Sequence, residues 1–411
     1  MKADGRGYTL VELVVAMLIF SVVMTVISVS FNRIVTSSAQ ATKSAETDIG
    51  GLIGLEVLRT DLETAGMGLP WSLPDGIAYR ETCLGKVMVD GCPGTKVDIY
   101  EDADPVTKVP RPPRAVASGD NVGTNGSDYL VLKGSALGMS TASQGWSYLT
   151  WGAGGAVVKP SKSPIELVPG NGDRAVVLRS EVTTRGPTRT LVATSVSTGG
   201  ATSSSASPSA FTLHFNNPIP QDFTPATPEE RFLVYGIARR DDSGKLVPLS
   251  YPYNRADYFI KRSSLSEGGS PVCASGTGTL YKAVISQNSD RPVYYPLLDC
   301  VADLQVIYLL DTGYHVSDLG QGLQDATSAE EVRDRVKEIR LYLLAQQGKK
   351  ESGYLYPLGD LPVVVGDPAL DRGVGKVMGS RWGQTAFTAL TADWRHYHWK
   401  VYSIVVQPKN F

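Results

Sequence analysis

The chain has 411 residues, of which 42% are hydrophobic and 19% are charged, and its formal net charge at pH 7 is −2. A chain of this length can hold more than one hydrophobic core. A net charge so near zero, without a basic stripe, argues against a dedicated nucleic-acid-binding surface. The 42 glycines and 25 prolines predict many turns and much β-structure.

The first element is a short charged leader followed by a long apolar run. Residues Leu13–Asn32 include no charged side chain, and Glu12 is the only charge between Tyr8 and that stretch. About 20 apolar residues, at roughly 1.5 Å each, cross the hydrocarbon core of a bilayer as a helix. Lys2 and Arg6 precede the run, and the positive-inside tendency keeps such an end in the cytoplasm. The sequence therefore predicts a membrane-inserted chain whose remainder lies outside the cytoplasm.

Three fates are open to this segment. It can be a secretory signal cut near Ala39–Ala41, although the apolar run is longer than a typical signal and Glu12 interrupts its start. It can be a plain single-pass anchor, which leaves the costly carboxylate of Glu12 unexplained. In the third fate, a cut on the cytoplasmic side after Gly7 precedes the apolar run, so that the helix is kept.

The stretch from Gly7 to Leu13 resembles the class III signal of type IV pilins and pseudopilins, which has Gly before the cut and Glu as the fifth residue after it. Tyr8 stands where the family usually has Phe. The resemblance implies that prepilin peptidase removes Met1–Gly7 and methylates the amine of Tyr8. It also implies that Glu12 pairs with the N-terminal amine of a neighbouring subunit. Because a buried carboxylate without a partner is costly, the subunit that supplies this cation is held in register.

The helix is expected to continue past the membrane to about Ala65, where Gly66, Gly68 and Pro70 end it. Steps of three and four residues place one apolar stripe against a globular body. Three glycines beside this stripe predict a bend or a close contact. The stripe consists of Ile49, Leu52, Leu55, Leu58 and Leu62, and the glycines are Gly50, Gly51 and Gly54.

After the helix the sequence predicts mostly strands, which are irregular at first and clearer from Arg231 onward. Ser195–Ala210 is rich in Ser, Thr, Gly and Ala and indicates a loop. Residues Ser328–Glu331 fit a capping box, which predicts a short helix to about Val336. The alternation in Ile339–Leu344 predicts a strand with one buried face. The other expected strands are Lys86–Val89, Asp128–Lys133, Ala175–Leu178, Phe211–Phe215, Phe232–Arg239, Lys282–Ile285, Leu304–Leu310 and Tyr397–Val406.

The four cysteines are Cys83, Cys92, Cys273 and Cys300. Outside the cytoplasm they can oxidise, and three pairings are possible. Nearness in sequence favours Cys83 with Cys92 and Cys273 with Cys300. A zinc site is the alternative, but neither couple has CxxC spacing and no His lies near the first couple.

Candidates for chemistry are few, and each has an ordinary structural interpretation. Asp311-Thr312-Gly313 spells the aspartic-protease triplet, but that chemistry needs a second carboxylate, and Asp and Gly after a strand are common turn residues. Asp311 and Asp318 are a second candidate, as oxygen ligands of a calcium ion. His396 and His398 would share one face of a strand and could hold a metal, although a solvated edge or an interface is the commoner setting. Core packing explains most of the late aromatic residues, from Trp382 to Tyr402, and a subunit interface is the alternative for some of them.

Four further segments resemble minor pilins of the PilW type, in the same order along the chain. The J-type pseudopilin of type II secretion shares the plan of a helix on a sheet but is usually shorter, so the length favours a pilus component. The segments are Arg59–Gly66, Val301–Tyr308, Val336–Ala345 and Tyr402–Val406.

The resemblance implies an α+β fold in which a long N-terminal transmembrane helix packs on an antiparallel β-sheet that carries a large irregular β-rich insertion. The expected divisions are a leader (1–7), a filament-core helix (8–31), the outer half of the helix (32–66), an insertion or subdomain (67–230) and a C-terminal sheet domain (231–411).

The function so implied is that of a minor pilin, without enzymatic activity or cofactor, that starts pilus assembly in a tip complex. The alternatives are a type II secretion pseudopilin and a membrane-anchored periplasmic enzyme. The implied partners are prepilin peptidase, other minor pilins, the major pilin and a large tip adhesin. The chain would cross the inner membrane once, with a periplasmic C-terminus, and reach the pilus at the cell surface after assembly.

Overall fold

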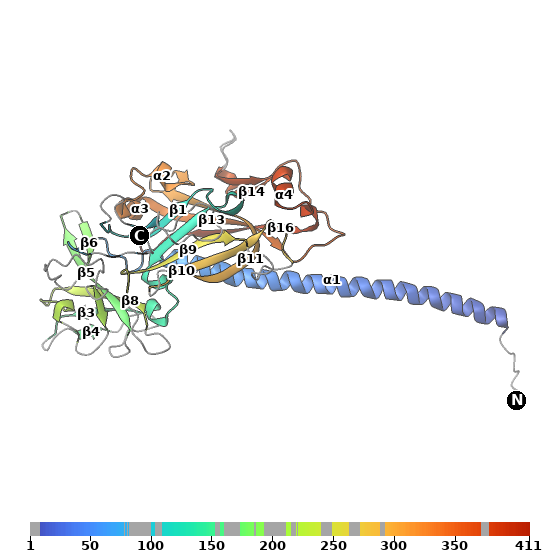
Figure 1. Ribbon diagram of the computed structural model, residues 1–411, viewed down its shortest axis with the longest axis horizontal. Helices are drawn as coiled ribbons and strands as arrows, with labels where there is room; N and C mark the ends of the chain where they lie inside the picture. The colour runs from blue at the N-terminus through green and yellow to red at the C-terminus, as the bar shows by residue number, and fades with distance from the viewer. Residues whose placement is uncertain are drawn as a thin grey trace, which may run out of the picture.

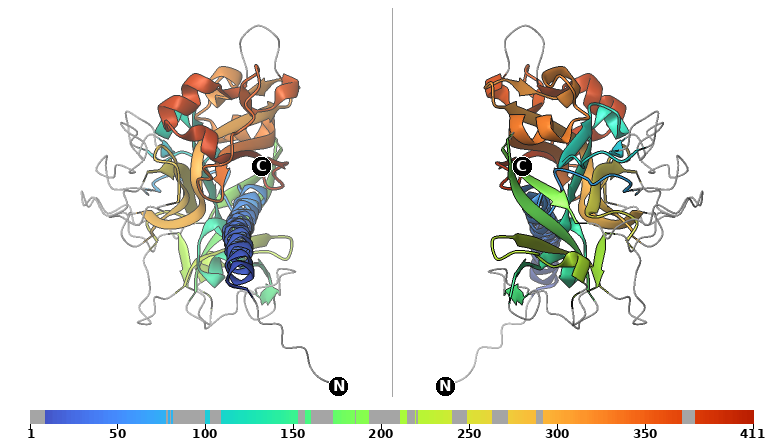
Figure 2. Two further views of the ribbon diagram at one scale, coloured as in Figure 1. Left: turned by 90° about the vertical axis from the view of Figure 1, so that its right-hand side faces the viewer. Right: turned by 90° about the vertical axis from the view of Figure 1, so that its left-hand side faces the viewer.

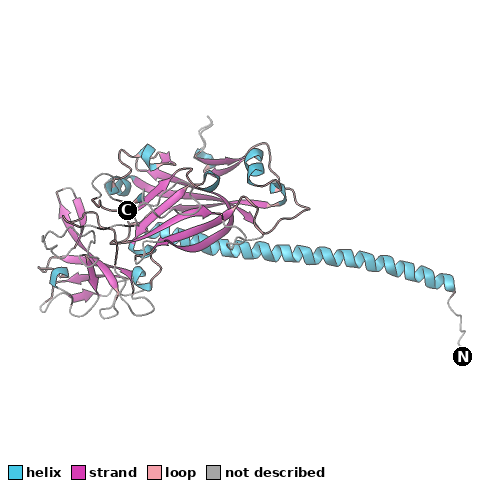
Figure 3. Ribbon diagram, in the orientation of Figure 1, coloured by secondary structure: helices cyan, strands magenta, loops and turns pink. Residues whose placement is uncertain are grey.

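The computed structural model describes residues 9–77, 79, 81, 100–102, 109–152, 157–159, 173–184, 186–192, 211–214, 219, 221–239, 249–262, 272–287, 292–370 and 378–411, with the side chains of 32–50, 157–159, 214, 221 and 321 left out. A long helix projects from a body of β-sheets (Figure 1), and strands dominate that body (Figure 3). The expected α+β fold, an N-terminal apolar helix followed by antiparallel sheets, is confirmed.

The helix, α1, spans Leu10–Thr64, close to the predicted bounds. Its N-terminal half projects free of the body, and its C-terminal half lies against the main sheet (Figure 1). It ends because Gly66 and Gly68, at φ +82° and +69°, adopt the left-handed conformation that glycine tolerates best.

The main sheet is antiparallel throughout and runs in the order β1-β2-β9-β10-β11-β13-β16, with the short β12 also paired to β11. Viewed along α1, the helix lies beside this sheet (Figure 2). The strands are β1 (Val116–Gly119), β2 (Tyr129–Gly134), β9 (Asn254–Lys261), β10 (Gly278–Ile285), β11 (Pro292–Leu310), β12 (His315–Val316), β13 (Val336–Gln347) and β16 (His398–Val406).

The predicted leucine stripe packs α1 onto one face of this sheet. Leu58 and Leu62 are fully buried and Leu55 nearly so, whereas Leu52 is 61% exposed and lies outside the contact. The helix can lie close to β11 because residue 54 is glycine. A Cβ at this position would lie 1.9 Å from the carbonyl oxygen of Leu297 on β11. The sequence prediction of a close contact at a glycine is thus confirmed at Gly54.

The opposite face of the sheet is also covered, by two separate layers. Over β11, β13 and β16 lie β14 (Val363–Gly366), β15 (Gly379–Trp382), α4 (Gln384–Leu390) and the 3-10 helix η8 (Trp394–His396). Trp382, Trp394, Tyr397 and Trp399 are buried in this layer, which confirms core packing for the late aromatic residues, while Tyr402 is buried on the α1 side. Over β1, β2, β9 and β10 lies an aromatic cluster that includes Tyr100, Tyr129, Tyr251, Tyr253 and Phe259.

This double cover corrects one prediction. β13 was expected to bury one face, but Leu344 is fully buried and Tyr342 is 7% exposed, and both face the β14–β15 layer. The alternate residues Ile339, Leu341 and Leu343 pack toward α1. The alternation of residues in β13 suggested a single buried face because Arg340 and Tyr342 are polar. The layer that covers their face comes from residues beyond 350.

A second, smaller sheet lies at the end of the body farthest from the N-terminus (Figure 1). Its order is β4-β3-β8-β5-β6, with β7 paired to β5. The strands are β3 (Trp146–Thr150), β4 (Val157–Lys159), β5 (Arg174–Thr183), β6 (Gly186–Leu191), β7 (Thr212–His214) and β8 (Arg231–Ala238).

The pairing of these strands places the domain boundary elsewhere than expected. β1 and β2 fall within the predicted insertion 67–230 but belong to the main sheet, and β8 falls within the predicted domain 231–411 but belongs to the second sheet. The insertion is therefore residues 135–253, between β2 and β9. The predicted boundary followed from where the strand patterns become clearer along the chain. It was wrong because the strands of each sheet pair between segments that are distant in sequence.

The remaining helices are short. The predicted helix after Ser328 is α3 (Ala329–Arg335), and the Ser328 hydroxyl accepts a hydrogen bond from the Glu331 amide at 3.3 Å. The Glu331 carboxylate does not complete the capping box but accepts from the Asp325 amide at 3.1 Å. The others are η2 (Thr124–Gly126), η3 (Ser135–Leu137), η4 (Thr141–Gln144), η5 (Gln221–Phe223), α2 (Leu319–Gly322) and η7 (Pro368–Leu370). The predicted strand Lys86–Val89 and the loop Ser195–Ala210 lie outside the described residues.

Candidate functional site

The most unusual surface of the molecule is the free half of α1. Residues Leu10–Phe31 form a segment long and apolar enough to cross a membrane, and none of it is buried within the chain. Phe20 and Phe31, for example, are 62% and 64% exposed. An apolar surface of this extent marks contact with a membrane or with other proteins.

Glu12 is the only charged residue of this segment, and it closes the first turn of the helix. Its Oε2 accepts hydrogen bonds from the Thr9 amide at 2.9 Å and from the Thr9 hydroxyl at 3.0 Å, and the Glu12 amide donates to the Thr9 hydroxyl at 3.3 Å. This reciprocal capping box stabilises the start of α1. Among the described residues, no donor contacts the other oxygen, Oε1. Gly7 and Tyr8, the predicted processing site, lie outside the described residues.

A second acidic residue of α1 anchors the other end of the helix to the sheet. Asp61 Oδ2 accepts from Lys282 Nζ on β10 at 2.7 Å and from the Tyr258 hydroxyl on β9 at 2.6 Å. Burial raises the pKa of Asp61, and the Lys282 ammonium opposes this rise. Asp61 was not predicted as a site, although it immediately precedes Leu62 of the buried stripe, where an acid needs a partner.

Cys273 and Cys300 form a disulfide, as their spacing favoured. The bond joins the segment before β10 to the middle of β11, two neighbouring strands of the main sheet. Cys83 and Cys92 lie outside the described residues.

A group of buried charges fixes the segment before β1 against the main sheet. Glu81 contacts Lys133 Nζ at 2.8 Å and Arg255 Nη1 at 2.9 Å, and Asp102 also accepts from Lys133, at 2.5 Å. Burial disfavours the ionised form of Glu81, but Lys133 and Arg255 outweigh it and lower the pKa from 4.5 to about 2. Asp257 completes the group by binding the Arg255 guanidinium with both oxygens.

The residues proposed for catalysis or metal binding have local partners. Asp311 precedes a turn in which Gly313 has φ +79°, and it pairs with Arg335 at 3.1 Å, as expected of turn residues. Asp318 caps α2 by accepting from the Gly320 amide at 2.8 Å. Within the described ranges, no three His, Cys, Asp or Glu side chains gather closely enough to hold a metal ion.

The two histidines do not share the face of a strand, because β16 begins only at His398 and His396 belongs to η8. His396 Nδ1 lies 2.9 Å from the Tyr354 carbonyl oxygen, and His398 Nε2 lies 3.2 Å from Glu351. His398 also stacks on the ring of Tyr354 at 3.6 Å between centroids. The expected common face is thus wrong, because the 3-10 turn breaks the alternation.

Comparison with known proteins gives a match to a family model at the N-terminus. Residues 3–28 match the prokaryotic N-terminal methylation motif. A type IV-like pilin from Thermus thermophilus resembles the chain in structure with a TM-score of 0.18 and 16% sequence identity, over 38% of this chain and 79% of that one, a score too low to bear on the fold. None of the curated proteins compared with the chain matches it. The chain therefore carries the prokaryotic N-terminal methylation motif on a long apolar helix, α1, which joins an antiparallel sheet.

Proposed function

We propose that this protein is a PilW-like minor pilin that helps to start assembly of a type IV pilus, in a complex at the pilus tip. Prepilin peptidase cuts between Gly7 and Tyr8 and methylates the new Tyr8 amine. The chain waits in the inner membrane with its body in the periplasm and then enters the filament through residues 8–31. Its action is packing and one directed charge pair rather than catalysis.

The observation that carries this proposal is the uncovered apolar half of α1 with a single carboxylate near its start. Thr9 occupies only Oε2 of Glu12, so Oε1 is available to the N-terminal amine of another subunit. An isolated carboxylate is costly in hydrocarbon, so an amine that pairs with it adds both affinity and register.

The capping box provides a test that separates the two roles of Glu12. Glu12→Gln keeps a residue able to cap the helix but removes the charge, because Glu and Gln both serve at this position of a capping box. Thr9→Ala removes the cap, at a cost of about 1 kcal/mol, and keeps the charge. We expect Glu12→Gln to abolish pilus assembly while membrane levels stay normal, and Thr9→Ala to assemble.

Two further readouts complete the test. Gly7→Trp should leave the leader uncut, which a mass shift of the protein would show. Loss of pili rather than loss of secretion distinguishes a pilus component from a type II secretion pseudopilin. Normal piliation in Glu12→Gln, or impaired piliation in Thr9→Ala alone, would contradict the proposed charge pair.

The second sheet supports a role in partner contact at the tip. It lies at the end of the body farthest from the membrane helix, where it would be presented outward (Figure 1). We propose that it meets a tip adhesin or another minor pilin. Replacing 141–248 with a short Gly/Ser linker should preserve membrane insertion and the main sheet but abolish adhesion or binding of the tip partner. Normal adhesion and partner binding in this variant would refute the assignment.

A further inference from the structure

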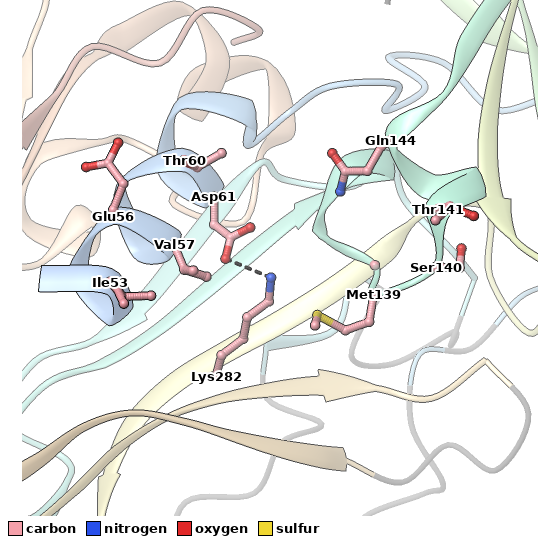
Figure 4. A pocket seen from close by; sticks show the side chains of 11 residues that line it. Ile53, Glu56, Val57, Thr60, Asp61, Met139, Ser140, Thr141, Gln144 and Lys282 are labelled. Atoms are coloured by element: carbon pink, nitrogen blue, oxygen red, sulfur yellow. Dashed lines mark hydrogen bonds and ion pairs between the residues drawn. The ribbon is translucent and has the colours of Figure 1, made fainter. Parts of the chain in front are cut away.

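A pocket of about 520 Å³ lies between the outer half of α1 and the turn that leads into the second sheet. Ile53 and Val57 of α1 form one wall, and Met139 and Thr141 form the other (Figure 4). Ile53 and Met139 are 64% and 56% exposed, so the walls present apolar side chains to solvent. Its size is that of pockets that bind ligands or anchoring side chains, which run from about 300 to 1,000 Å³.

The floor of the pocket is polar and has no net charge. It is formed by Lys282 and Asp61, whose side chains point toward each other in Figure 4 and pair at 2.7 Å. A lysine ammonium has three N–H donors. Within the described part of the chain, Asp61 is the only acceptor that Lys282 contacts. The remaining donors therefore favour an acceptor that enters the pocket.

The charges around the pocket restrict what this acceptor can be. Asp61 already neutralises Lys282, and Glu56 at the rim adds a negative charge. A carboxylate or phosphate would be repelled by these two acids, whereas a neutral carbonyl or hydroxyl would not. The pocket therefore suits an apolar group that carries a neutral hydrogen-bond acceptor.

A membrane lipid cannot be that group if α1 spans the bilayer as proposed. Ile53 follows Phe31 by residues that extend about 33 Å along a helix. The headgroup region is only about 5–8 Å deep on each side of the hydrocarbon core. Leu52, which precedes Ile53 on α1, is also 61% exposed. A peptide segment can cover this whole surface, and α1 itself leads from it to the apolar half that other subunits would cover.

We propose that this pocket binds a segment of a partner subunit, which inserts an uncharged apolar side chain between Val57 and Met139 and offers a main-chain carbonyl to Lys282. The inference rests on the proposed function in taking the partner to be another subunit of the same assembly. It adds a specific contact at the base of the body to the contacts of the membrane helix.

Photo-crosslinking in the native membrane tests this proposal with the full chain. The probe is a benzophenone amino acid at Met139, and the control is the same probe at Leu361, which is 83% exposed in the layer on the other face of the sheet. We expect a crosslink from position 139 to an uncharged segment of another pilin-like subunit, located by peptide mass spectrometry.

Two variants close the pocket without touching the sheet. Val57→Trp fills the pocket. Ile53→Glu adds a negative charge at the rim of the pocket, at an exposed position of α1. Each should lower the yield at position 139 roughly tenfold or more, the loss expected when one buried aliphatic contact is removed. Equal yield in both variants, crosslinks only to lipid, or an equal crosslink to the same subunit from position 361 would overturn the proposal.

The result of the crosslinking experiment can be distinguished from the result of the Glu12→Gln test. A pocket-dependent crosslink together with normal piliation in Glu12→Gln would refute the charge pair and retain the pocket. Failure of piliation in Glu12→Gln together with a crosslink insensitive to Val57→Trp would refute the pocket and retain the pilus role.

Discussion

The contact between Gly54 and β11 predicts that two glycines of the same helix respond oppositely to the same substitution. In Gly54→Ala the new Cβ would lie 1.9 Å from the carbonyl oxygen of Leu297, against an ordinary contact distance of at least 3.4 Å. The helix must therefore retreat by about 1.5 Å at this point. Backbone cannot rotate away as a side chain can, so Leu55 and Leu58 lose contact with the sheet.

The magnitude follows from two opposing effects. Overpacking a well-packed contact costs about 1–3 kcal/mol, with a backbone clash at the upper end. Alanine gains about 1 kcal/mol over glycine in helix propensity. The net loss for Gly54→Ala is about 2 kcal/mol. In Gly51→Ala the new Cβ lies 2.9 Å from Cδ1 of Leu298, a methyl group that can move, so this variant should range from neutral to about 1 kcal/mol more stable.

Urea unfolding of the full chain in detergent, followed by tryptophan fluorescence, measures both variants. The separation between them, about 2–3 kcal/mol, is the quantity to compare, since the detergent and the denatured state are common to both. Equal stability of the two variants, or a Gly54→Ala variant at least as stable as the native chain, would refute the close approach of α1 to β11.

The remaining predictions concern the disulfide and the buried charges. Replacing Cys273 and Cys300 together by Ser should lower the free energy of unfolding by about 3.5 kcal/mol, because the bond closes a loop with a sequence separation of 27; an unchanged urea midpoint would contradict this. The pKa of Glu81 in the folded chain, about 2, lies below its ordinary value of 4.5. Its ionised form therefore stabilises the fold above pH 4.5 by about 3 kcal/mol, and this contribution is lost as the pH falls through 4.5 toward 2. Glu81→Gln should be less stable at pH 7 and should lose less stability between pH 5 and 2 than the native chain; parallel pH profiles would contradict the assignment.

The sequence allowed the prediction of elements that depend on local pattern. The span and most of the leucine stripe of α1, the N-cap at Ser328 and strands such as β2, β8 and β16 could be predicted, because each follows from periodicity or from capping chemistry. β11 was predicted only from Leu304, since Pro292 and Pro296 argue against a strand. In the structure Pro296 lies next to a register shift in the pairing with β10, an irregularity of the kind at which strands contain proline.

What could not be predicted depends on contacts between distant segments. Lys133 and Arg255 are fully buried, although charged residues in strands normally indicate a solvated face. Their partner Glu81 lies before β1, far from both in sequence, so no local sequence pattern predicts the pairing. At the candidate site, Glu12 was identified from its position in an apolar helix, whereas Asp61 was missed because its partners Tyr258 and Lys282 come from β9 and β10.

The position of the second sheet has a consequence for how the chain folds. Gly134 and Asn254 are paired neighbours in the main sheet, although residues 135–253 separate them in sequence. Bringing such distant ends together is slow if the intervening chain is unstructured, because the entropy of closing the loop must be lost before the contacts form. If the second sheet forms first, it shortens the path between the two ends. Because α1 precedes both sheets in the chain, the residues of β9 and later strands that cover Leu58 and Leu62 are synthesised only after those of the second sheet. Apolar side chains that stay uncovered during folding favour aggregation, so early formation of the second sheet would shorten the interval in which Leu58 and Leu62 are exposed.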